Sequence, residues 1–257
     1  MFDINTFAAA VVAATRAFGD TRPWWRGHRD AKWPLVPSVY RKGFERKESS
    51  LAQRFRLMAR SRSSSCPAAD DTFDWLFLMQ HYRLPTRLLD WSQSPLVALY
   101  FALEEPDDRD AAVWALCPTQ LNVAQGTAER ICSPGSDTLG HLGLQAFRPN
   151  KSAQDQRVLA LLTAEFDVRH MVQQSAFTIH GRSEPIDKMP DCNRFLMLLH
   201  IPAAEKKGLR QLLTLFGINR ASLFPDLENL AGELCSLEFQ ELLVVENDAA
   251  GKLRVSP

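Results

Sequence analysis

The sequence has no excess of charge of either sign and no long apolar run. Its 30 lysines and arginines balance 30 aspartates and glutamates, so no overall field draws the chain toward nucleic acid or a membrane, although this balance still allows a local basic patch. No segment approaches the roughly 18 consecutive apolar residues that a membrane-crossing helix needs. We therefore expect no membrane contact.

Cysteine is scarce and scattered. The five cysteines are odd in number, and no two of them have the CxxC spacing of a zinc or redox centre. Reduced and mostly buried thiols, as in a cytoplasmic protein, are the simplest interpretation of Cys66, Cys117, Cys132, Cys192 and Cys235.

Signature motifs of several enzyme classes are also missing. There is no HExxH or other metal-ligand spacing, no GxSxG, no Walker loop and no GxGxxG. We therefore expect no metal cofactor, and the pattern gives little support to a serine hydrolase, a P-loop enzyme or a Rossmann dinucleotide site.

What is present indicates an ordinary globular chain. Hydrophobic residues make up 46% of the 257 residues and charged ones 23%, which is enough apolar material for a sizeable core. Near the N-terminus, AAAVVAAT resembles the apolar part of a secretory signal, but Asp3 rather than a basic residue precedes it. We expect instead an amphipathic helix, capped by Asn5 or Thr6 and running to about Phe18.

Helical and extended segments alternate along the rest of the chain. The patterns predict helices over residues 38–62, 72–83, 95–103, 203–216 and much of 219–247. They predict strands over 24–26, 111–117, 169–181 and 195–202, and loops over 60–71 and 133–140. This mixture predicts a single α+β domain over residues 1–257, whose short strands form a cleft-bearing sheet core flanked by helices.

The stretch MQHYRLPTRLLDWSQSPLVALYFAL places much polar chemistry immediately before a core-forming helix. We expect Thr86, Arg87, Asp90 and Ser92 to lie in a turn at the N-terminus of that helix, where unpaired amides favour anions such as phosphate. The alternative is that Asp90 and Ser92 merely cap and brace the turn. Either Ser92 or Ser94 is expected to cap the helix.

Arg26, in WWRGH, is the last residue of the predicted strand over 24–26. Its guanidinium is a planar fork of donors suited to phosphate or carboxylate, and Gly27 beside it leaves room for a ligand. The alternative is a buried structural arginine paired with an acid such as Asp90.

Other side chains offer weaker signals. Four aromatic residues are candidate stacking partners for a planar base, although a core position is the simpler interpretation of each: Trp24, Trp25, Trp91 and Tyr82. Candidate acid–base groups are His28, His81, His170 and His180. Glu165, Glu184 and Glu246 are candidate functional carboxylates, but a solvated surface charge is the simpler interpretation of each.

Taken in order, WWRGH, SVYR and QHYRLPTRLLDWSQSPLVALYFAL resemble the FRG domain, a bacterial and phage family named for a Phe-Arg-Gly motif. VQQSAFTIHG and INRASLFPDLENLAGEL are similar to later parts of that family, so the resemblance runs from about Trp24 to Leu234. Trp25 stands where the Phe would be, and Arg83 stands where the family often has Gly. The matching positions are Arg26, Gly27, Gln80, His81, Thr86, Leu89, Asp90, Trp91 and Gln173.

The layout of this family is similar to that of ADP-ribosyltransferases, in which an arginine on the first strand, a Ser/Thr-containing strand and a late polar residue surround NAD. The resemblance implies that Arg26 holds the NAD phosphates or ribose, that residues 86–92 form the second motif, and that Gln173 lies near the third. Those transferases usually carry a catalytic glutamate there, and a glutamine cannot stabilise positive charge as a carboxylate does. Either another acid, Asp90 or Glu165, serves instead, or the chemistry differs.

The resemblance therefore implies an ADP-ribosyltransferase-like enzyme that uses NAD to modify a nucleotide, nucleic acid or protein in a bacterial toxin or phage-defence system. The expected catalytic set is Arg26, His81 as the base toward the acceptor, Asp90 and Gln173. The expected cofactor-binding set is Trp25, Gly27, Tyr82, Thr86, Arg87, Trp91, Ser92 and Phe177. Two alternatives remain: a non-enzymatic nucleotide- or nucleic-acid-binding module, and a metal-independent ribonuclease that uses His81 and Arg87.

Overall fold

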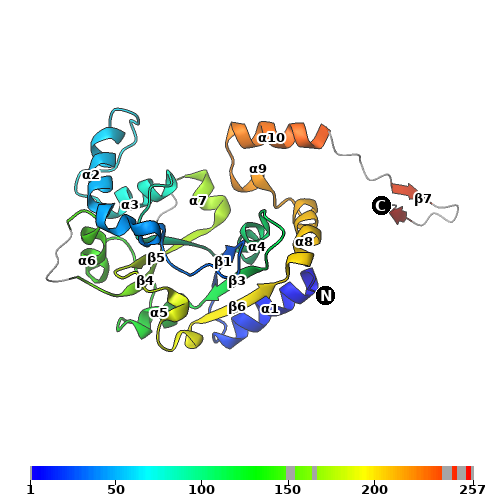
Figure 1. Cartoon of the computed structure of the whole chain (residues 1–257), viewed down its shortest axis with the longest axis horizontal. Helices are drawn as coiled ribbons and strands as arrows, with labels where there is room; N and C mark the ends of the chain where they lie inside the picture. The colour runs from blue at the N-terminus through cyan, green and yellow to red at the C-terminus, as the bar shows by residue number, and fades with distance from the viewer. Residues whose placement is uncertain (1, 149–153, 164–166, 239–244, 248–252, 256–257) are drawn as a thin grey trace.

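A computed structural model describes residues 2–148, 154–163, 167–238, 245–247 and 253–255 (Figure 1). Its centre is a six-stranded sheet in which every neighbouring pair is antiparallel. The strands, in spatial order, are β4 (Val158–Leu161), β5 (Ser175–His180), β2 (Leu88–Ser92), β1 (Trp24–His28), β3 (Ala111–Leu116) and β6 (Leu196–Ile201). The predicted α+β class is confirmed.

Helices surround this sheet. The α-helices are α1 (Ile4–Ala17), α2 (Glu48–Ala59), α3 (Thr72–His81), α4 (Pro95–Leu103), α5 (Pro118–Ala124), α6 (Asp137–Gln145), α7 (Val168–Gln173), α8 (Ala203–Leu215), α9 (Arg220–Leu223) and α10 (Leu227–Glu238). The 3₁₀ segments are η1 (Ser38–Lys47), η2 (Ile186–Lys188) and η3 (Cys192–Arg194). A separate two-stranded sheet pairs β7 (Val245–Asn247) with β8 (Leu253–Val255).

Two hydrophobic clusters bury both faces of the sheet. One joins α1, α4 and α8 to β1, β3 and β6, and the other joins α3 and α6 to β4 and β5. Along β5, Ala176 belongs to the first cluster and Phe177 to the second, because successive side chains of a strand point to opposite faces. Strands buried on both faces need continuous apolar runs, which explains VLAL and AAVWAL.

Most of the predicted elements are present. The helix α4 begins with Ser94 as its cap and Pro95 in its first turn, and α8 ends just before Gly217, whose φ is +76°. The first helix also exists and buries Phe7, but its cap is Asp3, whose carboxylate accepts a hydrogen bond from the Thr6 amide at 2.8 Å.

Several predictions of secondary structure are wrong. The expected turn over residues 86–92 is largely strand β2, since its apolar residues are buried on both faces of the sheet. The expected strand over 169–181 starts as helix α7, capped by Asp167, and Gln174 ends that helix in a left-handed conformation (φ +47°). The expected helix over 38–62 begins with ten residues of 3₁₀ helix, and α6 starts inside the expected loop over 133–140. Part of the predicted C-terminal helical segment, 239–244, lies outside the described residues.

Arg26 lies in the middle of β1 and not at a strand end. In the described part of the chain, β1 pairs with β2 only through Trp25 and Ser92, whereas it pairs along its whole length with β3. The ladder between β1 and β2 therefore stops next to Arg26 and Asp90. This interruption lies in the centre of the sheet.

The cysteines and the helices bear on two expectations from the sequence. All five cysteines are free, but only Cys117 and Cys132 are buried, so the expectation of mostly buried thiols is too strong. Among the helices that the structure describes, none is both long and apolar enough to cross a membrane.

Candidate functional site

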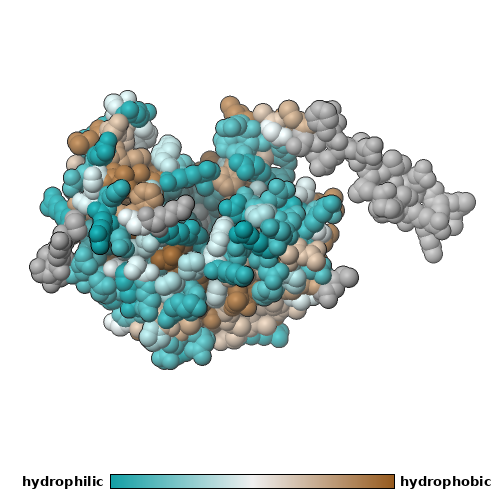
Figure 2. All heavy atoms as spheres, in the orientation of Figure 1, coloured by the Kyte–Doolittle hydropathy of each residue, from teal (hydrophilic) through white to brown (hydrophobic). Residues whose placement is uncertain are grey.

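A cavity of about 370 Å³ lies where the pairing of β1 and β2 stops. Figure 2 shows the surface hollowed between the α2–α3 side of the molecule and the α9–α10 side. The volume falls within the range of roughly 300–1,000 Å³ that is typical of small-molecule sites. Eight of the twelve predicted site residues line it, namely Trp25, Arg26, Gly27, His81, Asp90, Trp91, Ser92 and Gln173.

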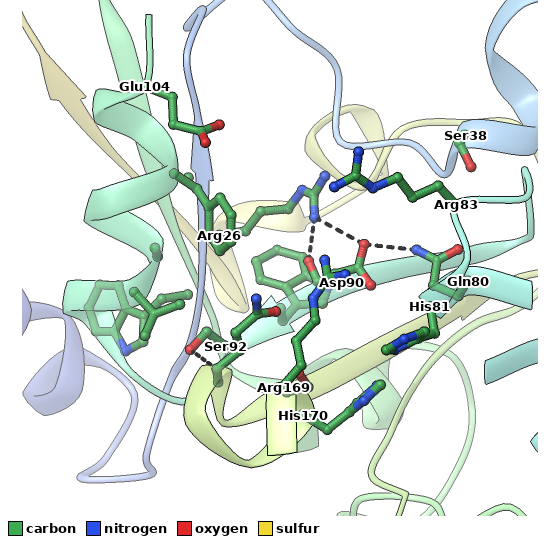
Figure 3. Close-up of a pocket in the computed structure, with 18 of the residues that line it drawn as sticks. Arg26, Ser38, Gln80, His81, Arg83, Asp90, Ser92, Glu104, Arg169 and His170 are labelled. Carbon is green, nitrogen blue, oxygen red and sulfur yellow. Dashed lines mark hydrogen bonds and ion pairs between the residues drawn. The ribbon is translucent and has the colours of Figure 1, made fainter. Parts of the chain in front are cut away.

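Arg26 is held in place by Asp90 on β2 (Figure 3) and by His28 on its own strand, β1. Its Nη1 donates to the backbone carbonyl of Asp90 at 2.5 Å and lies 3.9 Å from the Asp90 carboxylate. Its Nε donates to Nε2 of His28 at 3.1 Å. Burial lowers the pKa of Arg26 to about 10, with Asp90 opposing the shift, so the guanidinium stays charged at neutral pH. The interrupted ladder exposes a carbonyl that the arginine then uses.

His28 supports Arg26 as a neutral ring. Burial, followed by the charge of Arg26, lowers the pKa of His28 to about 3. A neutral imidazole can accept the hydrogen bond from the Arg26 Nε, which an imidazolium cannot. The candidate acid–base group His28 is therefore a positioning residue.

His180 is likewise buried and neutral, because burial lowers its pKa to about 3. Its Nε2 lies 2.9 Å from the hydroxyl of Thr178, and that hydroxyl accepts a hydrogen bond from the Trp91 indole at 3.1 Å. These bonds fix the edge of Trp91, so that its ring forms a rigid part of the cavity wall.

Asp90 is well exposed, with 53% of its side chain accessible to solvent. Its carboxylate accepts from the Gln80 amide at 2.8 Å, and the Gln80 carbonyl accepts from the Thr86 hydroxyl at 2.5 Å. Thr86 is 1% exposed and thus acts through Gln80 on Asp90, and not on a ligand. Gln80, which matches the family pattern, was not predicted as a site residue.

The cavity lining does not include the other three predicted cofactor-binding residues either. Arg87 is buried and makes a two-pronged ion pair with Glu48, at 2.9 and 2.5 Å. Phe177 is 1% exposed and belongs to the second hydrophobic cluster. Alternate side chains of β5 point to opposite faces of the sheet, and that of Phe177 points to the face covered by α3. Tyr82 lies 63% exposed at the end of α3, with its ring 4.9 Å from that of His81.

Gly27 has a packing role in addition to lining the cavity. A Cβ at this position would lie 1.9 Å from the carbonyl oxygen of Ala98 and 2.5 Å from the amide nitrogen of Ala102. Both are backbone atoms of α4. The glycine therefore allows α4 to pack directly on β1, which adds to the predicted benefit of space for a ligand.

Gln173 and Ser92 join three elements at the cavity wall. The Gln173 amide donates to the carbonyl of Leu223 at 2.9 Å, and its backbone carbonyl accepts from the Ser92 hydroxyl at 2.7 Å. Ser92 also accepts from the Ser94 amide at 3.0 Å. These bonds fix α7 and α9 to β2, so both side chains brace the site.

Sequence reasoning missed most of the cavity's positive charge. Four arginines line it, against the two carboxylates Asp90 and Glu104; the arginines are Arg26, Arg29, Arg83 and Arg169. Within the described ranges, neither Arg83 nor Arg169 forms an ion pair, although Arg169 lies over the ring of Phe224. Burial, and then the charge of Arg83, lowers the pKa of Arg169. Such unneutralised guanidinium groups favour an anionic ligand.

The imidazoles of His81 and His170 lie close to Arg169 (Figure 3), and together with Asp167 they form a cluster of three side chains. The Nδ1 atoms of His81 and His170 are 2.9 and 3.1 Å from the same oxygen, Oδ2 of Asp167. The two rings stack with centroids 6.0 Å apart. Burial lowers the pKa of His81, with Asp167 opposing the shift. No sequence pattern predicts the cluster, because its members come from the end of α3 and from the start of α7.

The remaining predicted carboxylates contribute little. Glu165 lies outside the described residues, and Glu246 belongs to β7, whose side chains are also outside the description. Glu184 pairs with Arg182 at 3.3 Å. Asp90 is thus the predicted acid that the structure places in the cavity.

Arg83 occupies a strained backbone position, which leads to a testable prediction. Its φ is +62°, a left-handed conformation that costs a non-glycine residue roughly 1–2 kcal/mol, and its side chain lines the cavity. We expect Arg83→Gly to raise the free energy of unfolding by up to about 1 kcal/mol. We expect it also to weaken the binding of inorganic pyrophosphate about tenfold, as measured by calorimetry.

Arg83→Ala is the matched control for this change, since it removes the cation but keeps the strain. It should weaken pyrophosphate binding equally without stabilising the fold. Wild-type affinity in both variants would show that Arg83 does not contact the anion.

The comparisons with known proteins match one part of the chain. Residues 21–111 match the family model of the FRG domain, a range that contains β1, β2 and α4 and with them Arg26, His81 and Asp90. The searches of curated proteins and of solved structures gave no match. The extension of the resemblance to Leu234, which includes Gln173, stays a prediction. The motifs at Arg26 and Asp90, which meet in the cavity, both lie within the segment that is similar to the FRG domain.

Proposed function

We propose that the cavity binds NAD and that the protein is an ADP-ribosyltransferase-like enzyme acting on a nucleotide, nucleic acid or protein target. The observation that carries the proposal is the contact between Arg26 and Asp90 in an open cavity with an excess of arginines. A pyrophosphate needs this kind of cationic donor set. The cavity's aromatic lining, including Trp25, Trp33 and Phe101, offers apolar contact to a base or to nicotinamide.

The interrupted sheet supports this assignment. The arginine lies on the first strand, and the second motif lies on the neighbouring strand where their pairing stops. The layout of Arg26 and residues 86–92 around a central cavity is similar to the arrangement around NAD in ADP-ribosyltransferases. We therefore include in the proposal that the α+β fold is of the ADP-ribosyltransferase-like type.

Asp90 takes the role of the usual glutamate in this proposal. The carbon–nitrogen bond between ribose and nicotinamide breaks, the bonding electrons leave with nicotinamide, and positive charge develops on the ribose. A carboxylate close to that charge stabilises it. Asp90 is exposed to the cavity and oriented by Gln80 and Arg26, whereas Gln173 is neutral and bonded to Leu223.

His81 is the base toward the acceptor in the same scheme. It lines the cavity, and Asp167 contacts its Nδ1 at 2.9 Å, the arrangement in which a carboxylate orients a catalytic imidazole. The nucleophile of the acceptor attacks the ribose carbon, and its proton passes to His81. The ribonuclease alternative has less support, because it relies on Arg87, which is buried against Glu48.

The test is incubation with NAD labelled in its adenylate part, together with nucleotides, RNA, DNA and bacterial protein extract. We expect nicotinamide release and label transfer, lowered at least 100-fold in Arg26→Gln and Asp90→Asn. Arg109→Gln is the matched control, since Arg109 is 55% exposed and pairs with Asp30 away from the cavity lining.

Circular dichroism should show that the tested variants keep the fold. Binding of NAD without turnover by the wild-type protein would favour the non-enzymatic module. If the wild-type protein neither binds NAD nor releases nicotinamide from it, the assignment of the cavity to NAD is overturned.

A further inference from the structure

We propose that His81, Asp167 and His170 form a binding site for a divalent transition-metal ion, of which Zn²⁺ is the test case, in the wall of the cavity. One ligand atom from each residue lies within 4.8 Å of the others. The two imidazole nitrogens are 2.9 and 3.1 Å from the Asp167 oxygen. Ligands that surround an ion at roughly 2.0–2.2 Å are separated from one another by similar distances, so small side-chain movements would complete the site.

The two oxygens of Asp167 have separate tasks. Oδ1 accepts the amide of His170 at 2.8 Å and caps α7, whereas Oδ2 faces both imidazoles. The cap fixes the orientation of the carboxylate, and α7 fixes His170 relative to it. A ligand held by such secondary contacts needs little reorganisation when an ion binds.

The donor set selects the class of ion. Two of the three donors are imidazole nitrogens, which suit zinc, iron, cobalt and nickel, whereas Mg²⁺ and Ca²⁺ prefer oxygen. Three protein ligands leave further coordination positions, and His81 and His170 both line the cavity (Figure 3). An ion here would be accessible to a small ligand in the same cavity.

This inference does not depend on the proposed function. If Nδ1 of His81 binds a metal, the ring can no longer act as the acceptor's base, so the two roles of His81 exclude each other at saturating metal. Metal binding is measured on the full chain without NAD, so failure of the transferase assay leaves the metal result intact.

The experiment is calorimetric titration of the metal-free full chain with Zn²⁺, and absorption spectroscopy with Co²⁺. We expect one equivalent of Zn²⁺ to bind and to raise the melting temperature. His81→Ala, His170→Ala and Asp167→Asn should each weaken binding at least tenfold, and Asp167→Asn retains a side chain able to cap α7. The Co²⁺ spectrum should lack the charge-transfer absorption of a cysteine thiolate.

His200→Ala is the matched control. His200 forms an exposed pair with Asp110 at 3.1 Å and lies outside the cluster, so this variant should bind Zn²⁺ like the wild type. The proposal is overturned if His81→Ala and His170→Ala bind as the wild type does, if His200→Ala loses as much affinity, or if the Co²⁺ spectrum shows thiolate ligation. Melting curves without metal establish that each variant is folded.

Discussion

Gly27→Ala is expected to disrupt the fold, with a loss of unfolding free energy beyond the roughly 1–3 kcal/mol typical of an overpacked core. The new methyl group would lie 1.9 Å from the Ala98 carbonyl oxygen and 2.5 Å from the Ala102 amide nitrogen. Neither atom can rotate away, because both belong to the backbone of α4. Relief requires α4 to move off β1, which breaks the first hydrophobic cluster. Urea unfolding followed by circular dichroism measures the loss.

Gly208→Ala provides the matched control for this substitution. Gly208 lies within α8, and a Cβ there meets no atom within 4 Å. Alanine should stabilise that helix by about 0.5–1 kcal/mol. If Gly27→Ala unfolded at the wild-type urea concentration, the close packing of α4 on β1 would be wrong.

Glu48→Gln is expected to lower the free energy of unfolding by about 3–5 kcal/mol. The carboxylate receives two hydrogen bonds from Arg87, at 2.9 and 2.5 Å, and both side chains are less than a tenth exposed. Removing its charge leaves a buried guanidinium without its counter-ion. The bonds from Arg87 to Gln145 and to the Leu142 carbonyl satisfy only part of it. The measurement is urea unfolding at neutral pH.

Two further variants separate a structural Arg87 from a ligand-binding one. The double change Glu48→Leu with Arg87→Met should recover much of the lost stability, because no charge is then left unpaired. Asp30→Asn breaks the partly exposed pair with Arg109 and should cost only about 0–1 kcal/mol. A cost as small as this for Glu48→Gln would show that Arg87 is not anchored by the pair.

Local signals in the sequence predict several elements well. Ser94 and Pro95 mark the start of α4, and the glycine at 217 marks the end of α8, because caps and breakers act through neighbouring backbone atoms. The meeting of Arg26 with Asp90 was also anticipated, from the order of the family's motifs.

The direction of side chains was much harder to predict. Residues 86–92 were expected in a turn, where neighbouring side chains can point to one ligand. In strand β2, alternate side chains point to opposite faces, so Asp90 reaches the cavity while Leu89 belongs to the core. The burial of Arg87 depends on Glu48, and no local pattern connects these two residues.

The cluster around Asp167 was missed for a related reason. The segment that contains Arg169 and His170 alternates enough to be read as a strand, yet it forms one short helix. A helical turn brings His170 back to Asp167, whereas a strand would separate them. Tertiary contacts with the end of α3 then complete the cluster, and these cannot be derived from the local sequence.

The single residue pair between β1 and β2 has a mechanical consequence. Half of the sheet, β4-β5-β2, is continuous, and so is the other half, β1-β3-β6, but the seam between them has little ladder of its own. A molecule that fills the cavity would contact side chains from both halves and connect them where the backbone hydrogen bonds between β1 and β2 are missing. Ligand binding and the contact between the two halves of the sheet are then thermodynamically linked. A true ligand should therefore slow amide hydrogen exchange in β1 and in β2 at once.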